Sequence, residues 1–135
     1  IESDLGPDGH SDADVLIHAL MDAMLGAAGL RDIGYYFPPE DDQYKGISSM
    51  LLLEKVNFLL KERGLQAYNI DIMVISETPK LKPHIDMMKS NLQSILEIPL
   101  DRISIKATTN EMLGAIGRRE GIAAQAVVSV YEGEI

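Results

Sequence analysis

The sequence of 135 residues contains no cysteine. Disulfide bridges, thiolate metal sites and thiol catalysis are therefore excluded, and any bound metal ion must be held by His, Asp or Glu. Basic residues are also scarce, because 12 Lys and Arg stand against 21 Asp and Glu, which gives a formal net charge of −9. Lys and Arg hold phosphate backbones and anionic lipid, so we expect no nucleic-acid partner and no membrane partner.

Long apolar runs are missing as well. No segment approaches the roughly 20 apolar residues that a transmembrane helix needs, and no signal segment opens the sequence. We therefore expect a soluble protein. Hydrophobic residues still make up 46% of the chain, which is enough for one globular domain with its own core.

Periodic patterns along the chain predict helices and strands in the order helix, helix, strand, helix, strand, strand. The expected segments are a helix that starts near residue 12 and ends within 26–29, a helix at 47–63, a strand at 68–77, a helix from Pro83 to before Pro99, and strands at 102–108 and 122–131. A parallel, right-handed crossover should span residues 70–108, and the last strand can return antiparallel. We therefore expect an α+β fold in one domain, residues 1–135, with a small mixed β-sheet covered by helices.

The first predicted helix carries a polar stripe in apolar surroundings. A capping box at Ser11 and Asp14 predicts its start. Asp14, His18 and Asp22 are spaced by four and share one face, while apolar residues fill nearly all other positions. Buried carboxylates and imidazoles need partners, so the stripe indicates a metal, a ligand or another subunit. Taken singly, these residues can instead be a helix cap, a core histidine and a solvent-facing edge. His10 is either a loop residue or a donor to an anion at the helix N-terminus.

Two further stretches carry groups that suit a nucleotide. Residues 106–121 combine Thr108, Thr109 and Glu111 with a glycine-rich loop and two arginines. Hydroxyls, backbone N–H groups and guanidinium groups are what phosphate oxygens need, and a carboxylate can add a hard cation. Residues 76–84 form a proline-stiffened turn after a strand, a common position for a ligand such as a flat base. The alternatives are a solvated loop and a plain connector.

The proline- and acid-rich stretch at residues 30–46 is either a lid or a connection. Within it, Asp32 is flanked by Ile33 and Gly34 and offers a carboxylate to sugar hydroxyls.

Four stretches resemble the 2-C-methyl-D-erythritol 2,4-cyclodiphosphate synthases of the non-mevalonate isoprenoid pathway: GHSDADVLIHALMDAMLGAAGLRDIG, FPPEDDQYKG, TPKLKPHI and IKATTNEMLGAIGRREGIAAQAV. The resemblance runs in consistent order from about Gly9 to Val130. It implies a metal-dependent lyase that cyclises 4-diphosphocytidyl-2-C-methyl-D-erythritol 2-phosphate and releases CMP. It also implies a homotrimer with active sites between subunits, located in the bacterial cytoplasm or a plastid.

The resemblance also implies roles for individual residues. His18 resembles a zinc ligand, and Glu111 resembles a residue that helps to hold a magnesium or manganese ion. His10 and Thr109 resemble catalytic residues, of which Thr109 stabilises the transition state. The residues that resemble substrate contacts are Ser11, Asp32, Ile33, Gly34, Phe37, Pro38, Pro39, Glu40, Asp41, Ser76, Glu77, Thr78, Pro79, Lys80, Leu81, Lys82, Thr108, Asn110, Glu111 and Arg118. The stretch from Ser76 to Lys82 resembles the cytosine pocket.

One departure from the family concerns zinc. The family takes its other two zinc ligands from an Asp-x-His on an early strand, and this sequence starts too late to contain that strand. We therefore expect the remaining zinc ligands upstream of Ile1, and a domain that lacks its N-terminal strand here. The alternative function is a noncatalytic trimeric protein that binds cytidine nucleotides, and a third is a purely structural interaction domain.

Overall fold

The computed structural model of the protein describes residues 7–38, 40, 41, 43, 48–75, 82–108, 114 and 123–133. The elements, in chain order, are α1 (Pro7–Ala27), α2 (Ile33–Tyr36), α3 (Ser49–Glu62), β1 (Leu65–Ile75), η1 (Lys82–His84), α4 (Ile85–Leu96), η2 (Leu100–Arg102), β2 (Ile103–Thr108) and β3 (Ala123–Glu132). Within these described ranges, no helix is both long and apolar enough to cross a bilayer.

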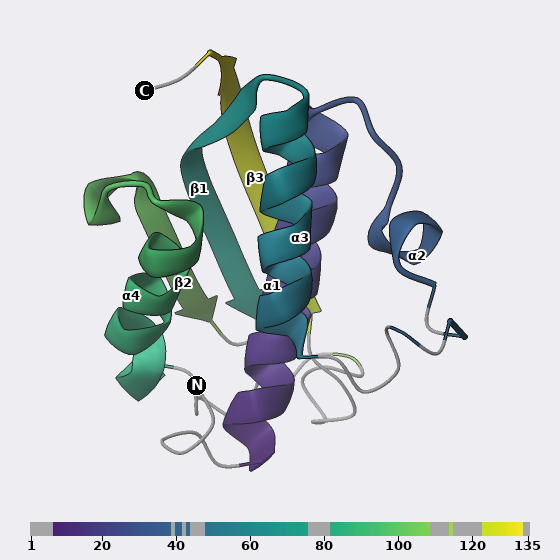
Figure 1. Ribbon diagram of the computed structural model, residues 1–135. Helices are drawn as coiled ribbons and strands as arrows, with labels where there is room; N and C mark the ends of the chain where they lie inside the picture. Colours follow the sequence, from purple (N-terminus) through teal and green to yellow (C-terminus); the bar gives the residue numbers. More distant parts are fainter. Residues whose placement is uncertain are drawn as a thin grey trace.

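The strands form one mixed sheet with the order β2-β1-β3. β1 and β2 run parallel with α4 between them in the chain, and β3 returns antiparallel to β1. Helices α1 and α3 pack on the sheet, while α4 lies beside β2 (Figure 1). The predicted α+β fold, with a small mixed sheet covered by helices, is confirmed.

The core lies between the sheet and the helices α1, α3 and α4. Leu16, Leu20 and Met24 recur at the spacing of a helical face and are completely buried. They belong to one cluster with Ile72 and Val74 of β1. Full burial of such side chains stabilises the fold by roughly 1.5–3 kcal/mol each, so this stripe fixes how α1 is rotated on the sheet.

The second face of the sheet carries the side chains that alternate with the core residues. We call it the open sheet face and define it by Asp71, Met73, Ile75, Lys106 and Val127. Asp71 pairs with Val127 in register, and Lys106 Nζ lies 3.0 Å from Asp71 Oδ1. Val127 is 71% exposed, whereas its neighbours in β3, Ala126 and Val128, pack on the core cluster. The open sheet face thus carries an exposed apolar side chain on β3, Val127.

Three element predictions were wrong, and one of them concerns β1, which begins at Leu65 rather than at residue 68. α1 begins at Pro7 rather than near residue 12. Proline is favoured at the first position of a helix, because the N–H group that it lacks would have no intrahelical partner there. The expected capping box at Ser11 and Asp14 therefore lies inside the helix. Residues 33–36, expected within a loop or lid, form the helix α2, which is too short to show a helical period.

Candidate functional site

The polar stripe lies on the exposed side of α1. Asp14, His18 and Asp22 are all exposed, while the apolar residues of the helix face the core. The shared face predicted from the spacing is confirmed, but the expectation of a stripe buried within apolar surroundings was wrong. A core histidine at His18 is excluded. The helix is amphipathic, so the imidazole of His18 is accessible to a ligand or another chain.

Both carboxylates of the stripe accept hydrogen bonds from later segments. Asp22 Oδ1 accepts from the backbone N–H of Ile33 at 3.0 Å, and Asp14 Oδ1 accepts from the hydroxyl of Ser49 at 2.7 Å. Ile33 is the first residue of α2 and Ser49 the first residue of α3. The stripe therefore ties the starts of two helices to α1, about one turn on either side of His18. This role was not predicted from the sequence, although the spacing by four was the available signal.

The predicted sugar-binding segment, Asp32 to Gly34, forms the start of α2. Asp32 is the N-cap residue, and its carbonyl accepts from the Tyr35 N–H at 3.2 Å. Its side chain makes no capping hydrogen bond. A Cβ placed on Gly34 would lie 3.5 Å from Asp32 Oδ2, so the carboxylate stays close to this glycine. The exposed carboxylate of Asp32 is thus not used in capping α2.

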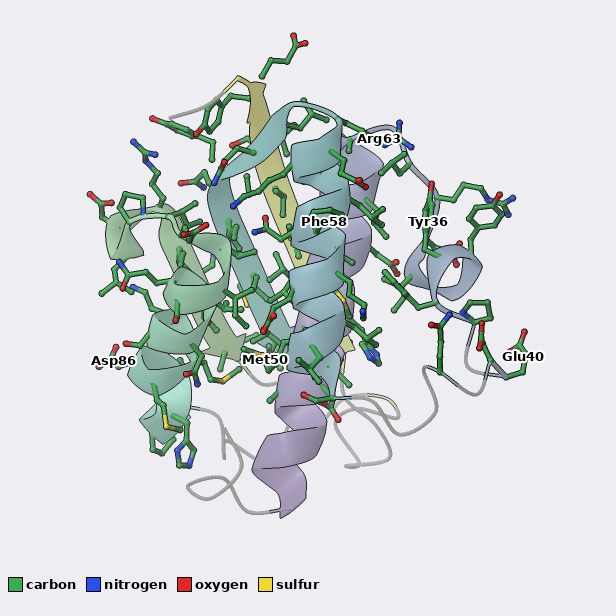
Figure 2. All side chains as sticks on the ribbon, in the orientation of Figure 1. Tyr36, Glu40, Met50, Phe58, Arg63 and Asp86 are labelled. Atoms are coloured by element: carbon green, nitrogen blue, oxygen red, sulfur yellow. The ribbon has the colours of Figure 1, made fainter. Side chains whose placement is uncertain are left out.

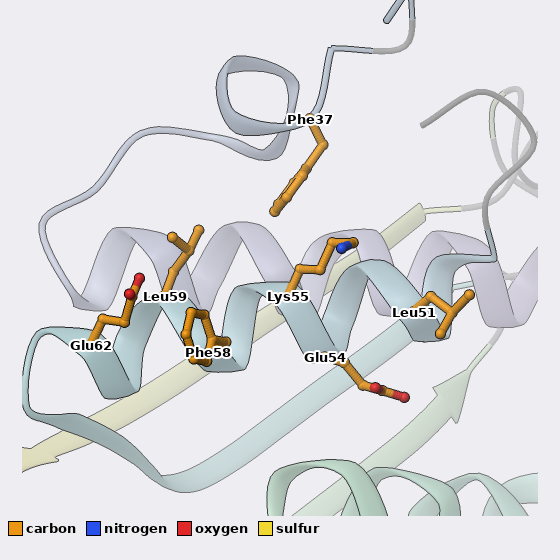
Figure 3. A pocket seen from close by; sticks show the side chains of 7 residues that line it. All are labelled: Phe37, Leu51, Glu54, Lys55, Phe58, Leu59 and Glu62. Carbon is orange, nitrogen blue, oxygen red and sulfur yellow. The ribbon is translucent and has the colours of Figure 1, made fainter. Parts of the chain in front are cut away.

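Phe37 points from the end of α2 toward α3, as Figure 3 shows. It lines a pocket of about 560 Å³. The remaining lining residues all belong to α3 and are Leu51, Glu54, Lys55, Phe58, Leu59 and Glu62. The predicted substrate contact Phe37 therefore faces the outer side of α3 in this chain.

Glu40, in the stretch that begins at Phe37, lies on the same side of the molecule. Figure 2 shows Tyr36 and Glu40 on this side, away from Asp86 of α4. Pro38 and Asp41 are half-buried, and Asp41 Oδ1 accepts from the Gln43 N–H at 3.1 Å in a local turn. Pro39 lies outside the described residues.

The ends of β1 and β2 bring the two predicted nucleotide-binding stretches to one edge of the sheet. Ile75, the last residue of β1, pairs with Thr108, the last residue of β2. The stretch that resembles the cytosine pocket follows Ile75 directly, and Thr109 follows Thr108. The carboxyl edge of parallel strands is where open α/β sheets bind ligands. Figure 1 shows both arrowheads at the end of the molecule where α1 starts.

Several predicted site residues lie outside the part of the chain that the structure describes. Those outside the described residues are Ser76, Glu77, Thr78, Pro79, Lys80, Leu81, Thr109, Asn110, Glu111 and Arg118. Three more are described by their backbone alone, with His10 and Ser11 in α1 and Lys82 in η1.

The predicted zinc ligand His18 has no set of co-ligands in the part of the chain that the structure describes. Over those residues, no group of three or more His, Asp or Glu side chains is placed to hold a metal ion. An exposed imidazole suits zinc, but a protein zinc site takes at least three protein ligands. A zinc site at His18 therefore needs ligands from outside the described residues.

Comparison with known proteins gives a consistent match along the chain. The YgbB family matches residues 1–131. The 2-C-methyl-D-erythritol 2,4-cyclodiphosphate synthase of Synechococcus elongatus is 58% identical over 127 residues, which cover 94% of this chain and 79% of that protein. The structure of the bifunctional IspDF from Campylobacter jejuni is similar with a TM-score of 0.85 and 45% identity, over 93% of this chain and 34% of that one. A CDP-bound structure of a 2C-methyl-D-erythritol-2,4-cyclodiphosphate synthase gives a TM-score of 0.77 and 34% identity, over 85% of this chain and 74% of that one.

Proposed function

The chain belongs to the YgbB family, and on this premise we propose that it cyclises 4-diphosphocytidyl-2-C-methyl-D-erythritol 2-phosphate to 2-C-methyl-D-erythritol 2,4-cyclodiphosphate with release of CMP. The family resemblance predicted from the sequence is confirmed. The chain is an enzyme of this family, a phosphorus–oxygen lyase.

The observation that carries the proposal is the pairing of Ile75 with Thr108 at the carboxyl edge of the parallel strands. Because Ile75 and Thr108 are neighbours, the stretch proposed to hold cytosine and the stretch proposed to hold the diphosphate begin at adjacent points of the sheet. A cytidine diphosphate needs both contacts at once, because its base and its phosphates are joined through one ribose. The CDP-bound relative of the same fold supports this assignment.

The chemistry needs no nucleophile from the protein. An oxygen of the substrate's 2-phosphate attacks the β-phosphorus, the bond from that phosphorus to the oxygen bridging the α-phosphate breaks, and CMP leaves with that oxygen. The chain contributes by positioning the substrate. It holds the 2-phosphate and the β-phosphorus of one substrate molecule close together, in the geometry from which they react. We assign Asp32 to the sugar hydroxyls, and His10, Ser11, Thr109 and Arg118 to the phosphates.

We further propose a zinc ion at His18 and a magnesium or manganese ion at Glu111. An imidazole suits zinc, and a carboxylate beside a diphosphate suits a hard cation. A metal ion bound there supplies Lewis-acid polarisation of a phosphoryl oxygen. His18 itself provides one ligand to the zinc ion, and the helix α1 fixes the position of that ligand.

We propose a homotrimer with active sites between subunits. The exposure of Val127 on the open sheet face and the exposure of the stripe on α1 both support contacts with another chain. The cyanobacterial relatives support a location in the bacterial cytoplasm or a plastid.

Turnover tests the function directly. The full-length protein is incubated with the substrate, zinc and magnesium, and CMP is followed by chromatography while the cyclic diphosphate is followed by phosphorus NMR. We expect stoichiometric CMP and cyclic product. Tight CDP binding without turnover would contradict the enzyme and favour the noncatalytic nucleotide-binding protein.

Thermal shift tests the base assignment. CDP with magnesium is expected to raise the melting temperature more than CMP, because the second phosphate adds contacts to the segment after Thr108 and to the cation. ADP and UDP with magnesium serve as controls for the base. Equal shifts from CDP, ADP and UDP would contradict a cytidine pocket.

A further inference from the structure

The first backbone N–H of helix α2 donates its hydrogen bond to another helix, α1. A helix of four residues is unstable alone, and its first N–H groups have no intrahelical acceptor. The Asp22 carboxylate of α1 accepts the N–H of Ile33 at 3.0 Å and places a negative charge at the positive end of the helix. The residue in the N-cap position, Asp32, makes no side-chain capping bond.

This arrangement is unusual because aspartate at an N-cap ordinarily accepts from the backbone of its own helix. Oδ2 of Asp32 is already close to Gly34 in the first turn. With the bond from Asp22 removed, the Asp32 carboxylate is an acceptor that already lies beside the first turn of α2 and can take over the cap. A carboxylate engaged in that cap is no longer directed outward to a ligand.

We propose that Asp22 is a positioning residue, which caps α2 from α1 and thereby keeps the carboxylate of Asp32 available to the substrate's hydroxyl groups. This inference rests on the proposed function, in which Asp32 contacts the sugar. Asp22 itself touches no substrate in this scheme. It acts through Asp32.

Asp14 offers a matched control within the same stripe. Its carboxylate also accepts a hydrogen bond at the start of a helix, from Ser49 of α3 at 2.7 Å. However, α3 has its own N-cap, because Ser48 accepts from the Met50 N–H at 3.1 Å. Loss of Asp14 therefore removes a tether without changing a group proposed to contact substrate.

The experiment is a double-mutant cycle in the full-length, zinc-loaded protein, with CMP release as the assay. Asp22→Ala is expected to raise KM about tenfold, the scale of one hydrogen bond to a charged group, with a smaller effect on kcat. Asp32→Ala should also raise KM about tenfold, and the double variant should have a KM no higher than that of Asp32→Ala alone.

Asp22→Asn keeps an acceptor oxygen and should restore most of the wild-type KM. Asp14→Ala should lower the melting temperature and leave KM unchanged.

The outcomes separate this inference from the function it rests on. An inactive wild-type protein would overturn the proposed function, and the positioning role with it. An active wild type would overturn the inference alone if Asp22→Ala keeps its KM, or if the effects of Asp22→Ala and Asp32→Ala simply add. CDP affinity and circular dichroism, measured on every variant, show whether the fold and the nucleotide pocket are intact.

Discussion

His18 occupies the middle of a helix face on which both neighbouring carboxylates already have hydrogen-bond partners. Asp14 and Asp22 contact the starts of α3 and α2, whereas the described residues provide no metal-binding group around the imidazole. The histidine is therefore held on a rigid backbone with its side chain exposed. Such a side chain suits a contact that the isolated chain does not complete.

Replacement of His18 tests the proposed zinc role. In the full-length protein, His18→Ala is expected to abolish zinc binding and most CMP release, because the site falls from three protein ligands to two. The metal-free protein should lose no more than about 0.5 kcal/mol of stability, since the side chain is exposed. Elemental analysis, CMP release and thermal melting are measured on one preparation.

CDP affinity, measured by calorimetry on the same sample, is the control for the His18 experiment. It should change little, because the proposed cytidine contacts follow β1 and β2 rather than α1. A folded variant with stoichiometric zinc and normal turnover would refute the metal role of His18.

The sequence predicted that the three stripe residues share a face, since spacing alone determines that. It did not predict their partners. Ile33 is 11 residues from Asp22, and Ser49 is 35 residues from Asp14. Contacts at such separations depend on how the chain folds back, which no local pattern encodes.

At the scale of elements, α4 ends in a strained conformation that an ion pair accompanies. Glu97 has φ 58° and ψ 44°, the left-handed region that favours glycine, and its N–H donates to the Gln93 carbonyl. Lys61 Nζ of α3 lies 2.8 Å from Glu97 Oε1. This hydrogen bond and the positive charge of Lys61 lower the pKa of the Glu97 carboxyl group.

Glu97→Gly is expected to raise the melting temperature in high salt. Glycine relieves the left-handed strain, and salt screens the exposed ion pair that the variant gives up. The matched control is Glu97→Gln, which loses the charge and keeps the strain, and should melt no higher than the wild type. A lower melting temperature for Glu97→Gly than for the wild type in about 1 M salt, where the Debye length is only about 3 Å, would contradict this explanation.

The same pair gives a small pH dependence. Because the folded state lowers the pKa of Glu97, the pair stabilises the protein above the ordinary glutamate pKa and loses this effect as pH falls through the lowered value. The difference in melting temperature between the wild type and Glu97→Gln should therefore shrink on acidification at low salt. A difference that grows instead would contradict this sign.

The longer elements could be predicted from local pattern and the shortest could not. α3, with Ser48 as its cap and Gly64 after its end, begins and ends within two residues of the prediction. α2 was missed because its start depends on Asp22 rather than on a cap of its own. β1 starts at Leu65, earlier than expected, because Leu65 to Ala67 are paired with β3.

For the whole molecule, the open sheet face is where we expect the trimer contact. Sedimentation equilibrium of the wild type should give about three times the chain mass. Val127→Lys should give a folded monomer. The position is exposed in the single chain and therefore tolerates a lysine, while the symmetry of the trimer would bring like charges together.

Phe58→Lys is the matched control for the oligomeric state. Phe58 is also an exposed apolar residue, 60% accessible, but it lies on α3. The trimer should persist in this variant. Dissociation by Phe58→Lys with no effect of Val127→Lys would place the contact on α3 instead.

The strand directions could be predicted at this scale. The helix between β1 and β2 predicts that these two strands are parallel, and the glycine-containing segment after β2 permits β3 to return antiparallel to β1. The exposure of the stripe and of Val127 could not be predicted, because a single sequence does not indicate which faces of an element contact another subunit.

The central position of β1 also affects the order in which the chain can fold during synthesis. Leu65 pairs with Glu132 and Ile75 with Ala123, so the longest strand finds its antiparallel neighbour only after nearly all of the described chain has left the ribosome. Until then one edge of β1 is open, with alternating Ile and Val side chains and unpaired backbone groups. Contacts this distant in sequence form slowly, and an unpaired apolar edge promotes association between nascent chains. This edge of β1 is therefore covered only once β3, the last strand of the sheet to be made, pairs with it.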